Sequence, residues 1–462
     1  MLQEKDKAFY SRVANIALPI LAQGLLTYLV GFIDNIMVGQ IGTEAMSGVT
    51  IGNQLHFVYA TCLLGIVAGG SVFGAQFYGS KNLNGFRESF RFRFRFLVCL
   101  ALSVIAFFIL LVFGKRFISL FLYTRGDGAD VAMTLLYGKQ YLTILLFGMA
   151  PYALTQVYAS AMKDMGKTLI PMIASIAAIL SNTALNYLLI FGMFGFPRLG
   201  VKGAAIATVI SRLIELFIIL FAVYKPESTF EDLHRAFGKH RKKAALSRRI
   251  LVKGLPLMVN EFFWSIGTVI MLQCYSFRGI QVVAGLNIAT SMYNIFTVVY
   301  QSVGGTVAIM MGQLIGAGKM QEAKEANKKL FSIAVRLSVI CGIALFAAAP
   351  FIPRLYATTP AVKDLAAQLM RILALCLPIS CFTHVAFFTI RAGGKTIVTF
   401  LYDSLNLWAI NIPLAFCLTR YTDMPIVPVY FICQMAEIVK LIAGYILVKK
   451  GVWLNNIVRE NQ

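Results

Sequence analysis

The chain contains 462 residues, of which 58% are hydrophobic and only 13% are charged. A soluble globular protein carries about 25% charged and about 45–50% apolar residues, so this sequence lacks the polar surface to cover itself in water. The net charge of +22 does not indicate nucleic-acid binding, because the lysines and arginines lie in short segments between long apolar runs. The composition excludes a soluble protein, a disordered chain and a fibrous repeat, and it indicates a protein embedded in lipid.

Twelve apolar runs are long enough to cross the hydrocarbon core of a bilayer, about 30 Å thick, as helices. In chain order they are 13–38, 53–78, 96–114, 138–160, 169–192, 203–224, 254–275, 285–312, 335–353, 370–390, 397–419 and 426–448. The first run continues past the length of a signal peptide and is expected to be a membrane span. The sequence therefore predicts an all-α integral membrane protein.

The distribution of basic residues predicts the orientation. With the N-terminus in the cytoplasm, and with a basic residue at the second position of a run counted in the segment before it, 29 of the 42 lysines and arginines fall in cytoplasmic segments, 11 fall outside and two lie well within spans. By the positive-inside rule, both termini are expected in the cytoplasm and the protein in the cell (plasma or inner) membrane. The segment 91–96 alternates Arg and Phe as a strand would, but beside a span it is expected to be a juxtamembrane stretch whose arginines anchor at lipid headgroups.

The two halves of the chain share a pattern. At an offset of 237 residues, Pro19 coincides with Pro256, Gly42 with Gly279, Gly48 with Gly285, Gln76 with Gln313 and Gly79 with Gly316. Because each half holds an even number of spans, the halves are predicted to be parallel repeats, with a substrate cavity between two lobes. The expected domains are an N-terminal six-helix lobe (1–224), a basic cytoplasmic linker (225–253) and a C-terminal six-helix lobe (254–462).

Enzyme motifs are not found in the sequence. Gly166-Lys-Thr168 and Gly394-Lys-Thr396 lack the earlier glycine of a phosphate loop, where Ala161 and Thr389 stand. The eight cysteines and four histidines do not have metal-ligand spacing. We expect the chain to have no enzyme activity and to hold no cofactor. Any transport of a solute across the membrane would then use an ion gradient or simply equilibrate the solute.

Three carboxylates lie inside predicted spans with no Lys or Arg within one helical turn: Asp34, Glu261 and Asp403. A charge near the bilayer centre costs about 3 kcal/mol or more, so such a group persists where it faces a cavity or a partner. Without a cationic partner it takes up a proton or coordinates sodium, and the alternative is a structural carboxylate bonded to nearby Asn or Ser side chains. Two pairs at i,i+3 are expected to be structural instead: Arg212 with Glu215, and Glu437 with Lys440.

Prolines stand at corresponding places in the first span of each half, at Pro19 and Pro256. A proline removes a backbone hydrogen bond and allows the helix to kink. Bending at these positions would change the shape of a cavity, as alternating access requires. The alternative is a static kink that packing tolerates.

The two six-span halves, with Pro19 and the run Asp34-Asn-Ile-Met-Val-Gly-Gln-Ile-Gly42, resemble the multidrug and toxic compound extrusion (MATE) family over nearly the whole chain. The resemblance implies two bundles around a V-shaped central cleft. It also implies export of cationic drugs in exchange for sodium or protons.

Residue by residue, the resemblance points to both halves. Asp34 matches the family's first-span aspartate and Asn182 matches an asparagine of the fifth span, but Asn186 stands where the DinF branch has a second aspartate. An amide takes up no proton, which disfavours a proton-only mechanism in the first lobe. Glu261 resembles the seventh-span glutamate of the NorM branch, and Asp403 lies near its carboxy-lobe aspartate. This implies a NorM-like exporter that leans towards sodium at Glu261 and Asp403, with H+ left open.

The predicted function is a Na+- or H+-coupled antiporter that exports amphipathic organic cations by alternating access, as a monomer in the bilayer. The predicted ion-coupling residues are Asp34, Glu261, Asp403, Asn182 and Asn186, and the predicted substrate-cleft residues are Gln23, Asn260 and Tyr293. The alternative is a flippase for lipid-linked oligosaccharides or other lipid precursors of the same superfamily. An anionic pyrophosphate would need basic residues in the cleft, and the basic residues within spans, Arg212 and Lys440, have acidic neighbours.

Overall fold

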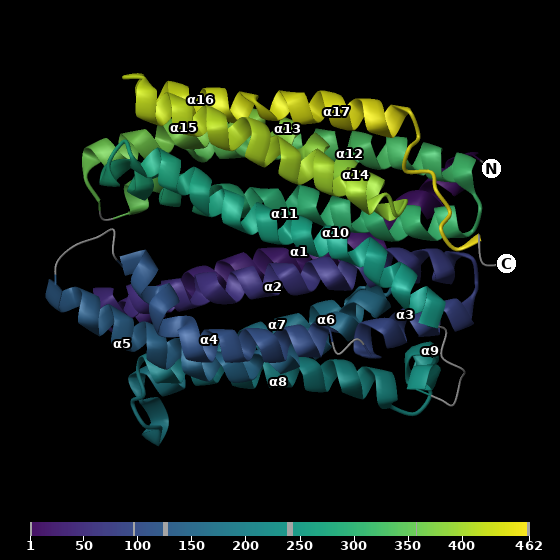
Figure 1. The fold of residues 1–462 in the computed structure, drawn as a ribbon, viewed down its shortest axis with the longest axis horizontal. Coiled ribbons are helices and arrows are strands. Elements are labelled where there is room, and N and C mark those ends of the chain that lie inside the picture. Colours follow the sequence, from purple (N-terminus) through teal and green to yellow (C-terminus); the bar gives the residue numbers. More distant parts are fainter. Residues whose placement is uncertain (1, 96–97, 123–127, 238–243, 357, 460–462) are drawn as a thin grey trace. The chain divides into compact units, whose positions relative to one another are not determined.

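The computed structural model describes residues 2–95, 98–122, 128–237, 244–356 and 358–459, and every regular element in these segments is a helix (Figure 1). Eleven helical stretches among the described residues are long and apolar enough to cross a membrane. They account for eleven of the twelve predicted spans. The remaining run, 96–114, lies on α4 (Val98–Leu122), and residues 96 and 97 are outside the described part. In lipid every backbone group must be paired inside the protein, and a helix achieves this within a single apolar run.

The chain divides into two compact units. The N unit comprises Ala22–Gly74 and Leu83–Leu251, and the C unit comprises Met1–Leu21, Ala75–Asn82 and Val252–Gln462. The predicted division into 1–224, 225–253 and 254–462 stays a prediction.

The N unit contains the larger part of the amino-terminal helices. Its elements are the end of α1 (Leu2–Gly39), most of α2 (Thr43–Gly79), α3 (Leu83–Arg95), α4, α5 (Gly128–Leu145), η1 (Leu146–Gly148), α6 (Met149–Asp164), α7 (Leu169–Phe191), η2 (Met193–Gly195), α8 (Val201–Tyr224), α9 (Glu231–His234) and η3 (Arg235–Phe237). Helix α7 is capped by Gly192, which has a left-handed φ of 72° and whose N–H bonds to the carbonyl of Leu188. This cap turns the chain back into α8.

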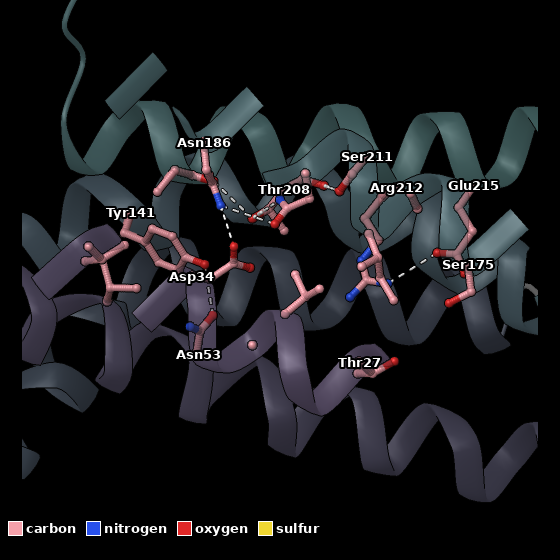
Figure 2. Close-up of a pocket in the computed structure, with 18 residues that line it drawn as sticks. Thr27, Asp34, Asn53, Tyr141, Ser175, Asn186, Thr208, Ser211, Arg212 and Glu215 are labelled. Carbon is pink, nitrogen blue, oxygen red and sulfur yellow. Dashed lines mark hydrogen bonds and ion pairs between the residues drawn. The ribbon is translucent and has the colours of Figure 1, made fainter. Parts of the chain in front are cut away.

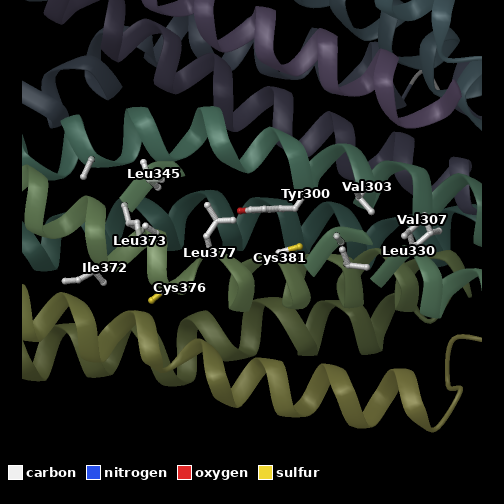
Figure 3. Packing of buried hydrophobic residues seen from close by; sticks show 14 of the residues in the cluster. Tyr300, Val303, Val307, Leu330, Leu345, Ile372, Leu373, Cys376, Leu377 and Cys381 are labelled. Atoms are coloured by element: carbon white, nitrogen blue, oxygen red, sulfur yellow. The ribbon is translucent and has the colours of Figure 1, made fainter. Parts of the chain in front are cut away.

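The C unit is built around α13. Its elements are the start of α1, the end of α2, most of α10 (Ala244–Ser276), α11 (Ile280–Gly316), α12 (Met320–Ala348), η4 (Ile352–Leu355), α13 (Pro360–Ala392), α14 (Thr396–Phe400), the π-helical stretches η5 (Leu401–Leu405) and η6 (Leu407–Asn411), α15 (Ile412–Tyr421), α16 (Ile426–Met435) and α17 (Glu437–Lys449). Figure 3 shows its core, where Leu373, Leu377 and Cys381 of α13 pack with Val307 of α11 and Leu330 of α12.

The arginine–phenylalanine run belongs to helix α3 up to Arg95, so the strand alternative is wrong there, and Phe96 lies outside the described residues. The expectation that its arginines reach lipid headgroups is also wrong for two of them. Arg91 and Arg93 are only 3% and 1% exposed. Arg91 pairs with Glu88 at 2.9 Å, and Arg93 pairs with Asp164 of α6. Helical spacing sets Glu88 beside Arg91, and the sequence pattern gave no sign of the partner on α6.

Within the C unit, the last turns of α2 cross α11 at very short range. A Cβ on Gly79 would lie 2.0 Å from the carbonyl oxygen of Gln313, and a Cβ on Gly316 would lie 1.9 Å from the carbonyl oxygen of Gln76. The contact is therefore reciprocal: each glycine faces the backbone of the other helix's glutamine. Any side chain at either glycine would force the helices apart.

Candidate functional site

Helices α1, α2, α5, α7 and α8 of the N unit enclose a pocket of about 250 Å³ (Figure 2). Its polar lining residues are Thr27, Asp34, Asn53, Tyr141, Ser175, Asn182, Asn186, Thr208, Ser211, Arg212 and Glu215. Its apolar lining includes Val30, Val38, Val49, Ala178 and Ile179. The pocket thus combines an acidic and amide-rich wall with an aliphatic surface.

Asp34 is held by amides from α7. Asn186 donates from Nδ2 to Oδ1 of Asp34 at 2.9 Å. With its amide turned so that the nitrogen faces the carboxylate, Asn182 donates to Oδ2 of Asp34 at 2.8 Å. In the described part of the chain, the carboxylate oxygens meet these amides and no basic side chain forms an ion pair with them. The three residues, which the family resemblance linked in the first lobe, meet in one cluster.

A second layer of hydrogen bonds fixes the walls around Asp34. The hydroxyl of Tyr141 on α5 donates to Oδ1 of Asn53 on α2 at 2.9 Å. The hydroxyl of Thr208 on α8 donates to the carbonyl of Ala204 at 3.0 Å. These residues were not predicted. One sequence signal could have identified Thr208. By helical spacing it lies on the same face of α8 as Ala204 and Glu215.

Arg212 and Glu215 lie along α8 from this cluster. Nη1 of Arg212 is 3.3 Å from Oε2 of Glu215, which confirms the pair expected at i,i+3. The guanidinium also lies over the ring of Tyr152, 4.7 Å from its centroid. Both charged residues line the pocket, a placement that the expectation of a structural pair did not include.

The C unit holds a separate polar cluster on the π-helical stretch η5. Oδ1 of Asp403 accepts from Nζ of Lys440 at 2.6 Å, and Oδ2 accepts from Nδ2 of Asn260 at 3.0 Å. Ser404 donates to Oδ1 of Asn260 at 2.7 Å. The wide turns of a π-helix are frequent at functional sites. The contact with Lys440 of α17 gives Asp403 a cationic partner from another helix.

Two further contacts complete this cluster. Oε1 of Glu261 lies 3.8 Å from Nη1 of Arg391, and Oε1 of Glu437 accepts from Nδ2 of Asn411 at 3.0 Å. The expected pairing of Glu437 with Lys440 is wrong among the described contacts. The ammonium of Lys440 reaches across to Asp403, because its long flexible stem lets it meet a carboxylate on another helix.

The other predicted residues are placed as follows. Pro19 lies inside α1 and Pro256 inside α10, and both helices continue through their proline. Tyr293 of α11 packs against the core of the C unit. Gln23 of α1 accepts through its carbonyl from Thr27 and does not line the N-unit pocket. Their predicted roles in bending and in the substrate cleft stay predictions.

Comparison with known proteins gives consistent results. The MatE family model matches the chain twice, over residues 19–188 and 256–417. The probable multidrug resistance protein NorM of Thermotoga maritima is 23% identical over 422 residues, covering 91% of this chain and 88% of that protein. The probable multidrug resistance protein YoeA of Bacillus subtilis is 25% identical over 455 residues, covering 96% and 95%.

Solved structures share the fold. A multidrug resistance MATE family transporter of the MOP superfamily, in an outward-facing conformation, matches with a TM-score of 0.83 at 19% identity, covering 96% of this chain and 95% of that one. A MOP superfamily transporter from Pyrococcus furiosus, described as having a binding pocket of reverse polarity, matches with a TM-score of 0.82 at 17% identity, covering 96% and 95%. At these identities the likeness shows the fold.

Proposed function

This chain belongs to the MATE family of multidrug transporters, and we propose that it is a cation-coupled antiporter that exports amphipathic organic cations. It is a multi-pass membrane protein of a transporter family and not an enzyme. The coupling ion (H+ or Na+), the organic-cation substrates, the two six-helix bundles around a V-shaped cleft, the monomeric state and the cytoplasmic placement of both termini belong to this proposal.

The observation that carries the proposal is Asp34 in the N-unit pocket. Its two carboxylate oxygens face the amides of Asn186 and Asn182 and meet no basic side chain among the described residues. In surroundings of low dielectric constant, an ionised carboxylate calls for a positive charge or a proton. A coupling cation and a cationic substrate would compete for this one group. Competition for a single carboxylate makes binding of one favour release of the other, which is the requirement for antiport.

The carboxylates of the C unit, Asp403 and Glu261, are better explained as structural groups than as a coupling site. Asp403 is 2.6 Å from the ammonium of Lys440, and Glu261 is 3.8 Å from the guanidinium of Arg391. A sodium ion at Asp403 would have to displace Lys440. We therefore place the coupling site at Asp34 and assign these pairs to holding the helices of the C unit.

The flippase alternative receives less support from the N-unit pocket. A lipid pyrophosphate needs several basic residues. Here Arg212 lines the pocket together with the two carboxylates Asp34 and Glu215. The balance of charge suits a cation.

The test is efflux of ethidium in everted membrane vesicles with sodium and proton gradients imposed separately. Wild type should accumulate ethidium under one of the two gradients. Asp34→Asn should lower that accumulation at least about tenfold while the protein stays folded in the membrane, because the amide carries no charge to exchange. Asp423→Asn, an exposed carboxylate in the loop before α16, is the matched control and should behave as wild type.

Two outcomes would contradict the proposal. Full export by Asp34→Asn would remove Asp34 from the coupling step. No movement of ethidium by wild type under either gradient would remove organic-cation antiport and direct attention to lipid-linked substrates.

A further inference from the structure

The last described residues of the chain cross the ends of three helices of the C unit. After α17 the chain turns at Gly451, which has a left-handed φ of 69°. Residues 452–459, which we call the strap, then continue as an irregular segment, the yellow chain beyond α17 in Figure 1. The strap forms hydrogen bonds at the ends of α2, α11 and α13, and all of these segments belong to the C unit.

Gln76, in the last turn of α2, holds the backbone of the strap. Gln76 is fully buried. Its amide oxygen accepts from the N–H of Ile457 at 3.0 Å, and its amide nitrogen donates to the carbonyl of Asn455 at 3.2 Å. The same nitrogen donates to the carbonyl of Ala392, the last residue of α13, at 2.9 Å. One side chain therefore ties the end of α2 to both the strap and α13.

Side chains of the strap bond to carbonyls at two further helix ends. The last carbonyls of a helix have no partner within the helix itself. Nδ2 of Asn456 donates to the carbonyl of Ile315, in the last turn of α11, at 2.8 Å. Nδ2 of Asn455 donates to the carbonyl of Gly393, directly after α13, at 3.2 Å. The strap thus caps α11 and α13 while Gln76 of α2 holds it in place.

Helix α2 belongs to both units, which gives this tie a mechanical consequence. It lies in the N unit up to Gly74 and in the C unit from Ala75. A movement of the N unit that carries α2 with it must therefore draw the last turn of α2 away from the strap. The bonds that hold the strap are neutral hydrogen bonds at helix ends, where water can replace its amides at little net cost. The strap is therefore easier to displace than the packed core of the C unit.

We propose that the strap is a latch on α2 that is seated in one half of the transport cycle and released in the other. While it is seated, Gln76 keeps the end of α2 on α11 and α13. When it leaves, Gln76 loses its bonds to Asn455 and Ile457, and the end of α2 is free to move with the rest of its helix. The inference rests on the proposed function, because that function supplies the cycle of alternating access.

The test measures how fast a cysteine in the strap reacts with a membrane-impermeant maleimide. Ile457→Cys keeps the backbone N–H that bonds to Gln76, and it places a thiol at a position that is only 4% exposed when the strap is seated. Everted vesicles present the proposed cytoplasmic side to the reagent. Trypsin cleaves after Lys450 and Arg459, so peptide 451–459 carries the new thiol apart from the native cysteines.

Labelling of the Ile457→Cys thiol should be at least about tenfold faster during ethidium export under the driving gradient than without it. The reason is that a buried thiol reacts in proportion to the population of the released state. Arg459→Cys places a thiol at an exposed position of the same strap and should label at the same rate in both conditions. A static cap of the helix ends would show no dependence on transport.

A second variant weakens the seat of the strap in the absence of transport. Asn456→Ala, added to Ile457→Cys, removes the donor to the carbonyls of Ile315 and Gly316, and should raise the resting labelling rate at least about fivefold. Asn287→Ala, the same substitution at an exposed position of α11, should leave that rate unchanged. An unchanged rate in Asn456→Ala, or an equal rise in both variants, would overturn the proposal.

The remaining outcomes separate the latch from the proposed function. Equal labelling of the Ile457→Cys thiol with and without the gradient, in vesicles that export ethidium, would overturn the latch while the proposed antiport stands. Resting labelling as fast as that of Arg459→Cys would show that the strap is not seated, and would overturn the latch too. If Ile457→Cys does not fold, Val458→Cys, also 4% exposed, takes its place as the probe. Wild type that moves no ethidium under either gradient would instead refute the proposed function, and with it the cycle on which the latch depends.

Discussion

Removing one partner of the buried ion pair between Arg93 and Asp164 should destabilise the N unit strongly. The side chain of Arg93 is 0% exposed and that of Asp164 is 3% exposed. Arg93 also donates to the carbonyl of Gly70 at 2.8 Å and to Ser160 at 2.8 Å, and Ser71 donates to the carboxylate. We predict that Asp164→Asn destabilises the protein strongly, because it leaves the guanidinium buried without its counter-charge.

The magnitude follows from the bonds that change. Asp164→Asn weakens two charge-assisted hydrogen bonds, from Arg93 and from Ser71, each worth about 1.5–3 kcal/mol. The sum agrees with the roughly 3–5 kcal/mol typical of removing one partner from a buried pair. Arg93→Met combined with Asp164→Leu removes both charges, and should recover most of the loss because neither charge is left unpaired.

The assay is equilibrium unfolding in mixed micelles, with the free energy of unfolding compared among wild type, Asp164→Asn, the single variants Arg93→Met and Asp164→Leu, and the double variant that combines these two. Glu231→Gln breaks the exposed pair with Arg235, whose side chains are 60% and 63% exposed, and should cost less than about 1 kcal/mol. A cost below about 1 kcal/mol for Asp164→Asn would refute the reasoning. A double variant as unstable as the sum of the single variants would refute it equally.

Two further predictions concern the C unit. Gly79→Ala should lower the thermal unfolding midpoint, because its Cβ would lie 2.0 Å from a carbonyl oxygen of α11 and must retreat by about 1.3 Å to reach ordinary contact. Gly31→Ala, with open space around the new methyl group, should leave the midpoint near that of wild type, and an equal loss in both variants would contradict this account. Lys440→Met should cost about 3–5 kcal/mol of unfolding free energy by leaving Asp403 without its cation. Adding Asp403→Asn to it should restore much of that stability in the same unfolding assay, and no recovery would argue against the ion pair.

The sequence predicted best what depends on local composition. The length and hydropathy of each run predict a spanning helix, because lipid leaves the backbone no other partner. The cluster around Asp34 could also be predicted from the sequence. Asn182 and Asn186 are one helical turn apart, and the family resemblance linked them to Asp34.

The sequence did not reveal which side chains on different helices form ion pairs with one another. Asp403 has no basic residue within one turn, yet Lys440, 37 positions away, reaches it. Arg93 lies beside an apolar run and was expected to anchor at headgroups, yet it is buried against Asp164 of α6. Spacing along one helix identifies neighbours on that helix, and the contacts between helices depend on packing that one sequence does not display.

The crossing of α2 and α11 joins corresponding positions of the two halves of the chain. Gly79 meets Gln313 and Gly316 meets Gln76, and the offset of 237 residues relates Gly79 to Gly316 and Gln76 to Gln313. A contact in which each of two surfaces meets the other's counterpart is the form that a twofold axis imposes on two identical subunits. Both glycines belong to this one contact, so a side chain at either position would separate the same two helices.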